Sequence, residues 1–211
     1  MRSSRPFRRR RAFRVPKPEI WIFCEGGKTE PGYIRDFVRD YRCVLARIEI
    51  VGGQGVPLTI ANAAVGKRTE LLKLARRTRY AFFSAFEVWA VFDVDVHPNV
   101  AQAKALCRQN AVGVCVSNPC FELWPIYHFG DWHRPETRHA LQKHLKSLMR
   151  SYDPDGSKKV NYNELKDSYF VARDRASLGL KKRSEEGSPE GNPSTNFYLL
   201  LDAIIKSGTA S

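Results

Sequence analysis

The segment IWIFCEGG, residues 20–27, decides the fold, because an unbroken apolar run ends there in an acid and two glycines. A second segment, VWAVFDVD at residues 88–95, repeats this arrangement with Asp93 and Asp95 at its end. Runs that are apolar on both faces are typical of strands in the middle of a sheet that helices cover on both sides. The two segments therefore predict a buried sheet with acidic side chains where its strands end.

Helical patterns alternate with these strands along the first part of the chain. Thr29 is expected to cap a helix that runs to Tyr41, and a strand over 47–51 precedes a helix over 57–77. A helix from Asn99 to Arg108 then leads to a strand over 113–117. This rhythm predicts an α/β fold with a mainly parallel central sheet flanked by helices. Helices are also expected near 121–129, 136–152, 163–183 and 195–206, which makes the C-terminal third, about residues 131–207, helical.

The positive charge is concentrated at the N-terminus. The formal net charge is +13, and residues 1–14 contain seven arginines and no acid. A run such as Arg8, Arg9, Arg10 and Arg11 cannot be buried, so residues 1–15 are expected to be a disordered arm before one domain at 16–207. The arm either binds the phosphates of a nucleic acid or is a solvated tail that aids solubility.

The chain shows no sign of export or of a membrane. No stretch approaches the roughly 20 apolar residues of a membrane-spanning helix, and no apolar segment of a signal peptide follows the arginines. The five cysteines form no C-x-x-C pair and are expected to be buried, reduced thiols. These features predict a soluble protein of the cytoplasm with no membrane partner.

The acids at the strand ends are the main candidate site. Asp93 and Asp95 are two residues apart, so they point the same way if the strand persists. Glu25 ends the other strand, and ligands gather at the carboxyl ends of parallel strands. Converging carboxylates repel one another, and an oxygen-only set favours Mg²⁺ or Mn²⁺ as the neutralising ion. The alternative is that these acids cap a loop and the next helix.

Four motifs resemble those of the RloB family. The resemblance covers about residues 19–205, and the motifs follow one another in the same order as in the family. They are CEGGKTEP at 24–31, FDVDVH at 92–97, SNPCFELW at 117–124 and NPSTN at 192–196. The first two are also similar to the signature motifs of Toprim domains, which occur in topoisomerases, primases and the nucleases of the OLD family. Val96 is a departure, because similar proteins usually have a charged residue there.

The resemblance implies a Toprim-like fold and a metal-dependent nucleic-acid hydrolase from a prokaryotic phage-defence or restriction-linked system. It also implies an AAA-type ATPase partner. By the matching motifs, Glu25 would be a metal ligand or general acid/base, while Asp93 and Asp95 would hold the metal. Glu30 would occupy the second acidic position of OLD-type sites, for which two-metal cleavage is proposed.

Four more residues are candidates for supporting roles. Glu122 is expected one turn into a helix, where it would add a carboxylate or act as a cap. Lys28 could stabilise charge on a phosphate or be solvent-exposed. His97 could orient Asp95 or carry a proton, and the alternative is surface packing. Asn118 could hydrogen-bond a ligand carboxylate or cap a helix.

Three functions remain open at this point. The first is hydrolysis of a phosphodiester in DNA or RNA. The second is a phosphatase of the haloacid-dehalogenase kind, since residues 91–96 also resemble the apolar strand that enters the D-x-D motif of that class, although Glu25 ahead of the aspartates argues against it. The third is a non-catalytic subunit that binds nucleic acid and regulates an ATPase, in which case the carboxylates would bind a structural ion.

Overall fold

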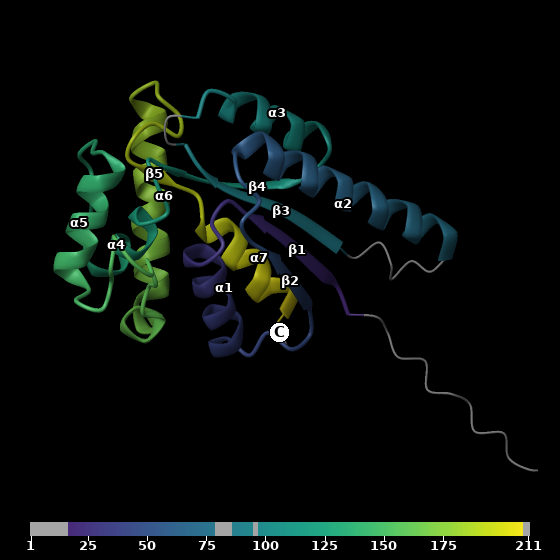
Figure 1. Cartoon of the computed structure of the whole chain (residues 1–211), viewed down its shortest axis with the longest axis horizontal. Helices are drawn as coiled ribbons and strands as arrows, with labels where there is room; N and C mark the ends of the chain where they lie inside the picture. Colours follow the sequence, from purple (N-terminus) through teal and green to yellow (C-terminus); the bar gives the residue numbers. More distant parts are fainter. Residues whose placement is uncertain (1–16, 79–85, 95–96, 209–211) are drawn as a thin grey trace, which may run out of the picture.

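The computed structural model describes residues 17–78, 86–94 and 97–208, and its centre is a five-stranded sheet with helices on both faces (Figure 1). The sheet has the order β2-β1-β3-β4-β5. The first four strands are parallel, and β5 is antiparallel to β4. The strands are β1 (Glu19–Cys24), β2 (Arg47–Val51), β3 (Phe86–Asp93), β4 (Gly113–Asn118) and β5 (Ser194–Thr195).

Seven α-helices are found in the described part of the chain. They are α1 (Thr29–Asp40), α2 (Pro57–Thr78), α3 (Val100–Gln109), α4 (Leu123–Phe129), α5 (Arg138–Leu148), α6 (Tyr169–Glu185) and α7 (Tyr198–Gly208). Helices α2 and α3 cover one face of the sheet, and α1 and α7 cover the other (Figure 1). Strand β1 serves both cores, because Ile20 and Ile22 face the α1 side while Phe23 faces α2.

The sheet has a topological switch point between β1 and β3. From β1 the chain passes through α1 to β2 on one side, and then through α2 to β3 on the other side of β1. The two connections therefore leave in opposite directions and lie on opposite faces. A crevice forms at the carboxyl ends of strands at such a point. Glu25 directly follows β1 and Asp93 ends β3, so both acids lie at this crevice.

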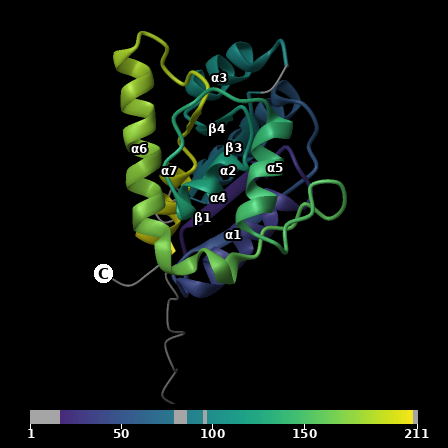
Figure 2. The same ribbon diagram turned by 90° about the vertical axis from the view of Figure 1, so that its left-hand side faces the viewer.

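Helices α4, α5 and α6 lie beyond the carboxyl ends of the strands (Figure 1). Figure 2 looks onto this end of the molecule, where α5 and α6 stand on either side of α4. Trp124 and Tyr127 of α4 are completely buried and join the aromatic core that contains Tyr33 and Phe37 of α1. This helical part is thereby fixed to the sheet layer, and α5 faces the crevice.

The expected α/β class, mostly parallel sheet and helical C-terminal part are confirmed, with some local corrections. Helix α1 begins at Thr29 and has Lys28 at its cap position without a side-chain cap bond, so the predicted Thr29 cap is wrong. The helix expected from 163 begins at Tyr169, after two short 3₁₀ turns at Tyr162–Glu164 and Lys166–Ser168. Strand β5 was not expected, because a two-residue strand has no periodicity.

All five cysteines are buried free thiols, as the sequence predicts. Among the described residues, no helix combines the length and the apolar character that spanning a bilayer requires.

Candidate functional site

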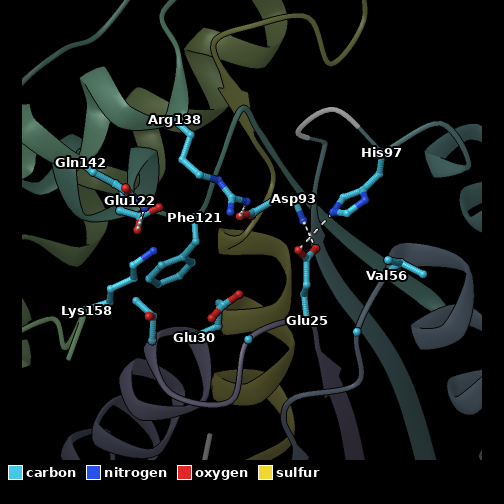
Figure 3. A pocket seen from close by; sticks show the side chains of 13 residues that line it. Glu25, Glu30, Val56, Asp93, His97, Phe121, Glu122, Arg138, Gln142 and Lys158 are labelled. Atoms are coloured by element: carbon cyan, nitrogen blue, oxygen red, sulfur yellow. Dashed lines mark hydrogen bonds and ion pairs between the residues drawn. The ribbon is translucent and has the colours of Figure 1, made fainter. Parts of the chain in front are cut away.

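A pocket of about 440 Å³ lies at the switch point, where four carboxylates from different elements line its wall (Figure 3). They belong to Glu25, Glu30, Asp93 and Glu122. Glu30, Asp93 and Glu122 retain only 5%, 8% and 5% of their surface exposure. Carboxylates are seldom buried to this degree without partners, so the charges around this pocket require an explanation.

The register of β1 and β3 brings Glu25 to Asp93. Cys24 pairs with Val91, and the Glu25 N–H donates to the Val91 carbonyl at 3.0 Å. The Asp93 N–H then donates to Glu25 Oε2 at 3.2 Å. On the other side His97 Nε2 lies 3.5 Å from Glu25 Oε1. The Glu25 carboxylate therefore lies between the Asp93 N–H and the His97 imidazole at the rim of the pocket, as Figure 3 shows.

Glu30 reaches the same pocket from the first turn of α1. Its carboxylate packs against Gly26, where an added Cβ would come within 2.5 Å of Glu30 Oε2. A side chain at residue 26 would therefore displace the Glu30 carboxylate. Burial raises the pKa of Glu30, and the nearby Glu122 and Glu25 carboxylates raise it further, against hydrogen bonds from the backbone at residues 30 and 26.

Glu122 enters the pocket from the N-terminus of α4. The helix begins at Leu123, and Glu122 occupies the cap position without a side-chain cap bond, so the expected place one turn inside the helix is wrong. Instead, Tyr152 donates to Glu122 Oε1 at 2.6 Å and Gln142 Nε2 donates to the same oxygen at 2.9 Å. Two buried donors thus fix one carboxylate oxygen.

Asp93 lies at the centre of the acidic group. Burial raises the pKa of Asp93 well above its usual value, and the charges of Glu30, Glu122 and Glu25 add to this effect. Arg138 of α5 opposes it with an ion pair of 2.9 Å to Asp93 Oδ2. Four carboxylates against two cations, Arg138 and Lys158, leave the lining of the pocket negative.

The donor set has the chemistry of a site for a hard divalent cation. Across residues 17–78, 86–94 and 97–208, however, no three His, Cys, Asp or Glu side chains are grouped closely enough to hold one ion. Mg²⁺ is commonly held by one or two carboxylates, with water and substrate phosphates in the other positions. The oxygen ligands and their mutual repulsion fit an ion bound in this open manner, with Glu25 and Asp93 as ligands.

The other residues expected at the site do not all lie in this pocket. His97 lines the pocket beside Glu25. Lys28 lines a neighbouring hollow instead. Asn118 caps none of the described helices, because α4 has Glu122 at its cap position, and the Asn118 Nδ2 donates to the Glu190 carbonyl at 2.9 Å. Asp95 and the arginines at 8–11 lie outside the described residues.

Three polar side chains from the C-terminal part of the pocket were not expected from the sequence. They are Arg138 and Gln142, which lie one turn apart on α5, and Lys158, which follows that helix. The four-residue spacing of Arg138 and Gln142 places them on one helical face. That spacing is the only sequence signal, and it becomes informative only once α5 is known to face the crevice.

Comparison with known proteins identifies the family of this chain. A family model described as RloB-like protein matches residues 20–204. The comparison with curated proteins and the comparison with solved structures each give no significant match. The family match extends from β1 into α7 and includes the described elements that form the pocket. The chain therefore belongs to the RloB-like protein family.

Proposed function

We propose that this protein is a metal-dependent phosphodiester hydrolase that cleaves DNA or RNA with Mg²⁺ or Mn²⁺. The observation that carries the proposal is the convergence of Glu25, Glu30, Asp93 and Glu122 on one open pocket. Folding brings together buried carboxylates that raise one another's pKa, as at Asp93 and Glu30, and this arrangement is costly unless a cation is bound there. The proposal also draws on the resemblance of the motifs to Toprim nucleases.

The side chains of the pocket suit this chemistry. Glu25 and Asp93 would hold the ion, with Asp95 as a further ligand according to the family motif. A bound divalent ion polarises a phosphate oxygen and makes bound water a better nucleophile. His97, 3.5 Å from Glu25, carries an imidazole that can accept or donate a proton.

Two cations of the pocket are suited to the substrate. Arg138 pairs with Asp93 at 2.9 Å, and Lys158 lines the same cavity. The described residues place no acid within ion-pair distance of Lys158. A phosphodiester that enters the pocket would meet both groups, and positive charge near the phosphate stabilises the charge that develops during cleavage.

The first test is cleavage together with ion binding. Purified protein is incubated with Mg²⁺ or Mn²⁺ and mixed DNA and RNA, alone and with the AAA-type ATPase that the family resemblance predicts as a partner. Binding of Mn²⁺ is measured by calorimetry on the same samples. We expect cleavage and Mn²⁺ binding by the wild type, and loss of cleavage with weakened Mn²⁺ binding in Asp93→Asn.

The outcomes separate the three functions. Equal cleavage by the wild type and Asp93→Asn would identify a contaminating nuclease and contradict the proposal. Mn²⁺ binding and nucleic-acid binding without cleavage, even with the ATPase, would favour a regulatory subunit with a structural ion. Turnover of small phosphate esters in place of polymers would favour the phosphatase. A chain that acts in phage defence should cleave only when its partner or trigger is present.

A further inference from the structure

A second hollow, of about 420 Å³, lies directly beside the carboxylate pocket and has the opposite charge. Its lining includes four cations and one acid: Lys28, Arg35, Arg39, Lys159 and Asp36. Asp36 pairs with Arg39 at 2.7 Å, so these two charges offset each other. We call this hollow, defined by the five residues named here, the basic groove.

The basic groove and the carboxylate pocket share two walls. In the turn after β1, Gly26 lines the pocket, while Gly27 and Lys28 line the groove. In the segment after α5, Lys158 lines the pocket and its neighbours Ser157 and Lys159 line the groove. These two backbone segments therefore separate the two hollows, and a polymer that lies across them would reach both.

The remaining cations of the groove have no acidic partner. Within the described ranges 17–78, 86–94 and 97–208, Lys28, Arg35 and Lys159 form no ion pair. All three side chains are exposed. Elsewhere on the surface many basic side chains are paired, for example Arg183 with Glu186 at 2.8 Å and Lys67 with Glu70 at 2.9 Å. The groove thus combines unpaired positive charge with a concave shape.

We propose that the basic groove holds the sugar-phosphate backbone of the nucleic acid and leads it to the carboxylate pocket. This inference rests on the proposed function, because it assigns a path to that enzyme's substrate. An acidic pocket repels a polyanion, so a substrate needs positive charge close by that holds the flanking phosphates. Lys28, Arg35 and Lys159 supply that charge on one side, and Lys158 continues it into the pocket.

A polymer fits these observations better than a small anion. The cations are exposed and come from α1, from the turn before it and from the segment after α5, so they do not enclose one ligand. Spread-out contacts of this kind are typical of backbone binding, where each phosphate contact releases counterions and makes the affinity depend on salt. The groove should accordingly bind without strong sequence preference.

The test measures binding without catalysis. Fluorescence anisotropy is recorded with single-stranded and duplex DNA and RNA oligonucleotides, in EDTA and over a range of salt concentrations. The groove variant is Arg35→Gln with Lys159→Gln. The matched control is Lys73→Gln with Arg76→Gln, which removes two exposed cations from α2 on the other face of the sheet. Both pairs lower the net charge of +13 by two, and the arginine-rich N-terminus is unchanged.

We expect the groove variant to bind its preferred oligonucleotide roughly tenfold more weakly at physiological salt. The slope of log K against log salt should fall by about 0.7 for each lost single-strand contact. The control should stay within about twofold of the wild type. Equal losses in the two variants, or no binding by the wild type, would overturn the groove proposal. Unchanged melting temperatures would show that both variants are folded.

The same variants separate this proposal from the proposed function. If the groove variant binds weakly but the wild type never cleaves in Mg²⁺ or Mn²⁺, even with the ATPase partner, the groove stands and the nuclease proposal fails. If the wild type cleaves and the groove variant keeps the same KM, the groove proposal fails and the nuclease stands. A raised KM with an unchanged kcat supports both.

Discussion

Two buried polar regions meet α1 and α4, and they differ in how their polar groups are satisfied. In the closed region His128 Nε2 lies 3.3 Å from the Tyr33 hydroxyl, and its Nδ1 lies 3.0 Å from the Leu165 carbonyl. A carbonyl only accepts, so Nδ1 carries the proton and Nε2 accepts from Tyr33. In the open region, burial raises the pKa values of Asp93 and Glu30, and the neighbouring carboxylates raise them further.

The difference indicates which polar groups serve the fold and which serve function. The ring nitrogens of His128 have protein partners, and a neutral imidazole there costs little. The carboxylate pocket keeps repelling charges next to solvent, and the ion pair between Arg138 and Asp93 offsets only part of this repulsion, which lowers stability. Groups of the first kind should affect stability when changed, and groups of the second kind should affect activity.

The largest expected effect is on activity, in Glu25→Gln. In the wild type the Asp93 N–H donates to Glu25 at 3.2 Å. The amide oxygen of glutamine can still accept this hydrogen bond, while the negative charge is lost. Cleavage should fall by about two to three orders of magnitude, and the melting temperature should not decrease, because like-charge repulsion at the pocket is relieved. Kinetics and thermal unfolding are measured on the same preparation. A large loss of stability with activity retained would show that Glu25 serves the fold and not function.

The next effect is the pH dependence of stability that comes from His128. Burial lowers its pKa from the ordinary 6.5 to about 4. Between these values the unfolded chain binds the proton and the folded chain does not, so stability falls as the pH is lowered from 6.5 towards 4. The contribution is about 1.4 kcal/mol per pH unit and about 3 kcal/mol in total.

Urea unfolding at several pH values measures this contribution. The difference in unfolding free energy between the wild type and His128→Gln should shrink as the pH falls through that range. The exposed His139 provides the control, because His139→Gln should give a curve parallel to the wild type. Parallel curves for both variants would show that His128 is not the titrating group.

The smallest effect concerns the hydroxyl that holds Glu122. Tyr152→Phe removes a hydrogen bond of 2.6 Å to a buried carboxylate, which should cost about 2 kcal/mol. In a chain of this size that lowers the melting temperature by about 4–8 °C. Tyr162→Phe is the control, because its hydroxyl donates at 3.0 Å to Asp40, an exposed carboxylate that water can solvate. Equal losses would show that Glu122 is no more dependent on its donor than a surface acid.

The strand ends could be predicted from sequence because their signal is local. An apolar run that stops at Glu25 or at Asp93 gives both the strand and the position of the acid, and parallel pairing then places the two acids together. Glu30 was found through the family motif. The predicted roles of these residues and of the N-terminal arginines remain predictions.

The residues that the C-terminal part contributes to the carboxylate pocket could not be predicted, because their positions depend on how the helices pack. Arg138 and Gln142 belong to an amphipathic helix, and no local pattern indicates that one of its faces meets Asp93 and Glu122. Lys158 was missed for the same reason, since it reaches the pocket from an irregular segment. Such residues become visible only when the path of the whole chain is known.

The switch point has a consequence for the moment during synthesis at which the carboxylate pocket is complete. Glu25 and Asp93 are neighbours only after α2 has crossed the sheet, and the donor that fixes Glu122 comes from Tyr152. A nascent chain on the ribosome that has released only its first half therefore lacks a finished centre. Synthesis itself would thus delay the proposed cleavage activity until the polypeptide is nearly complete.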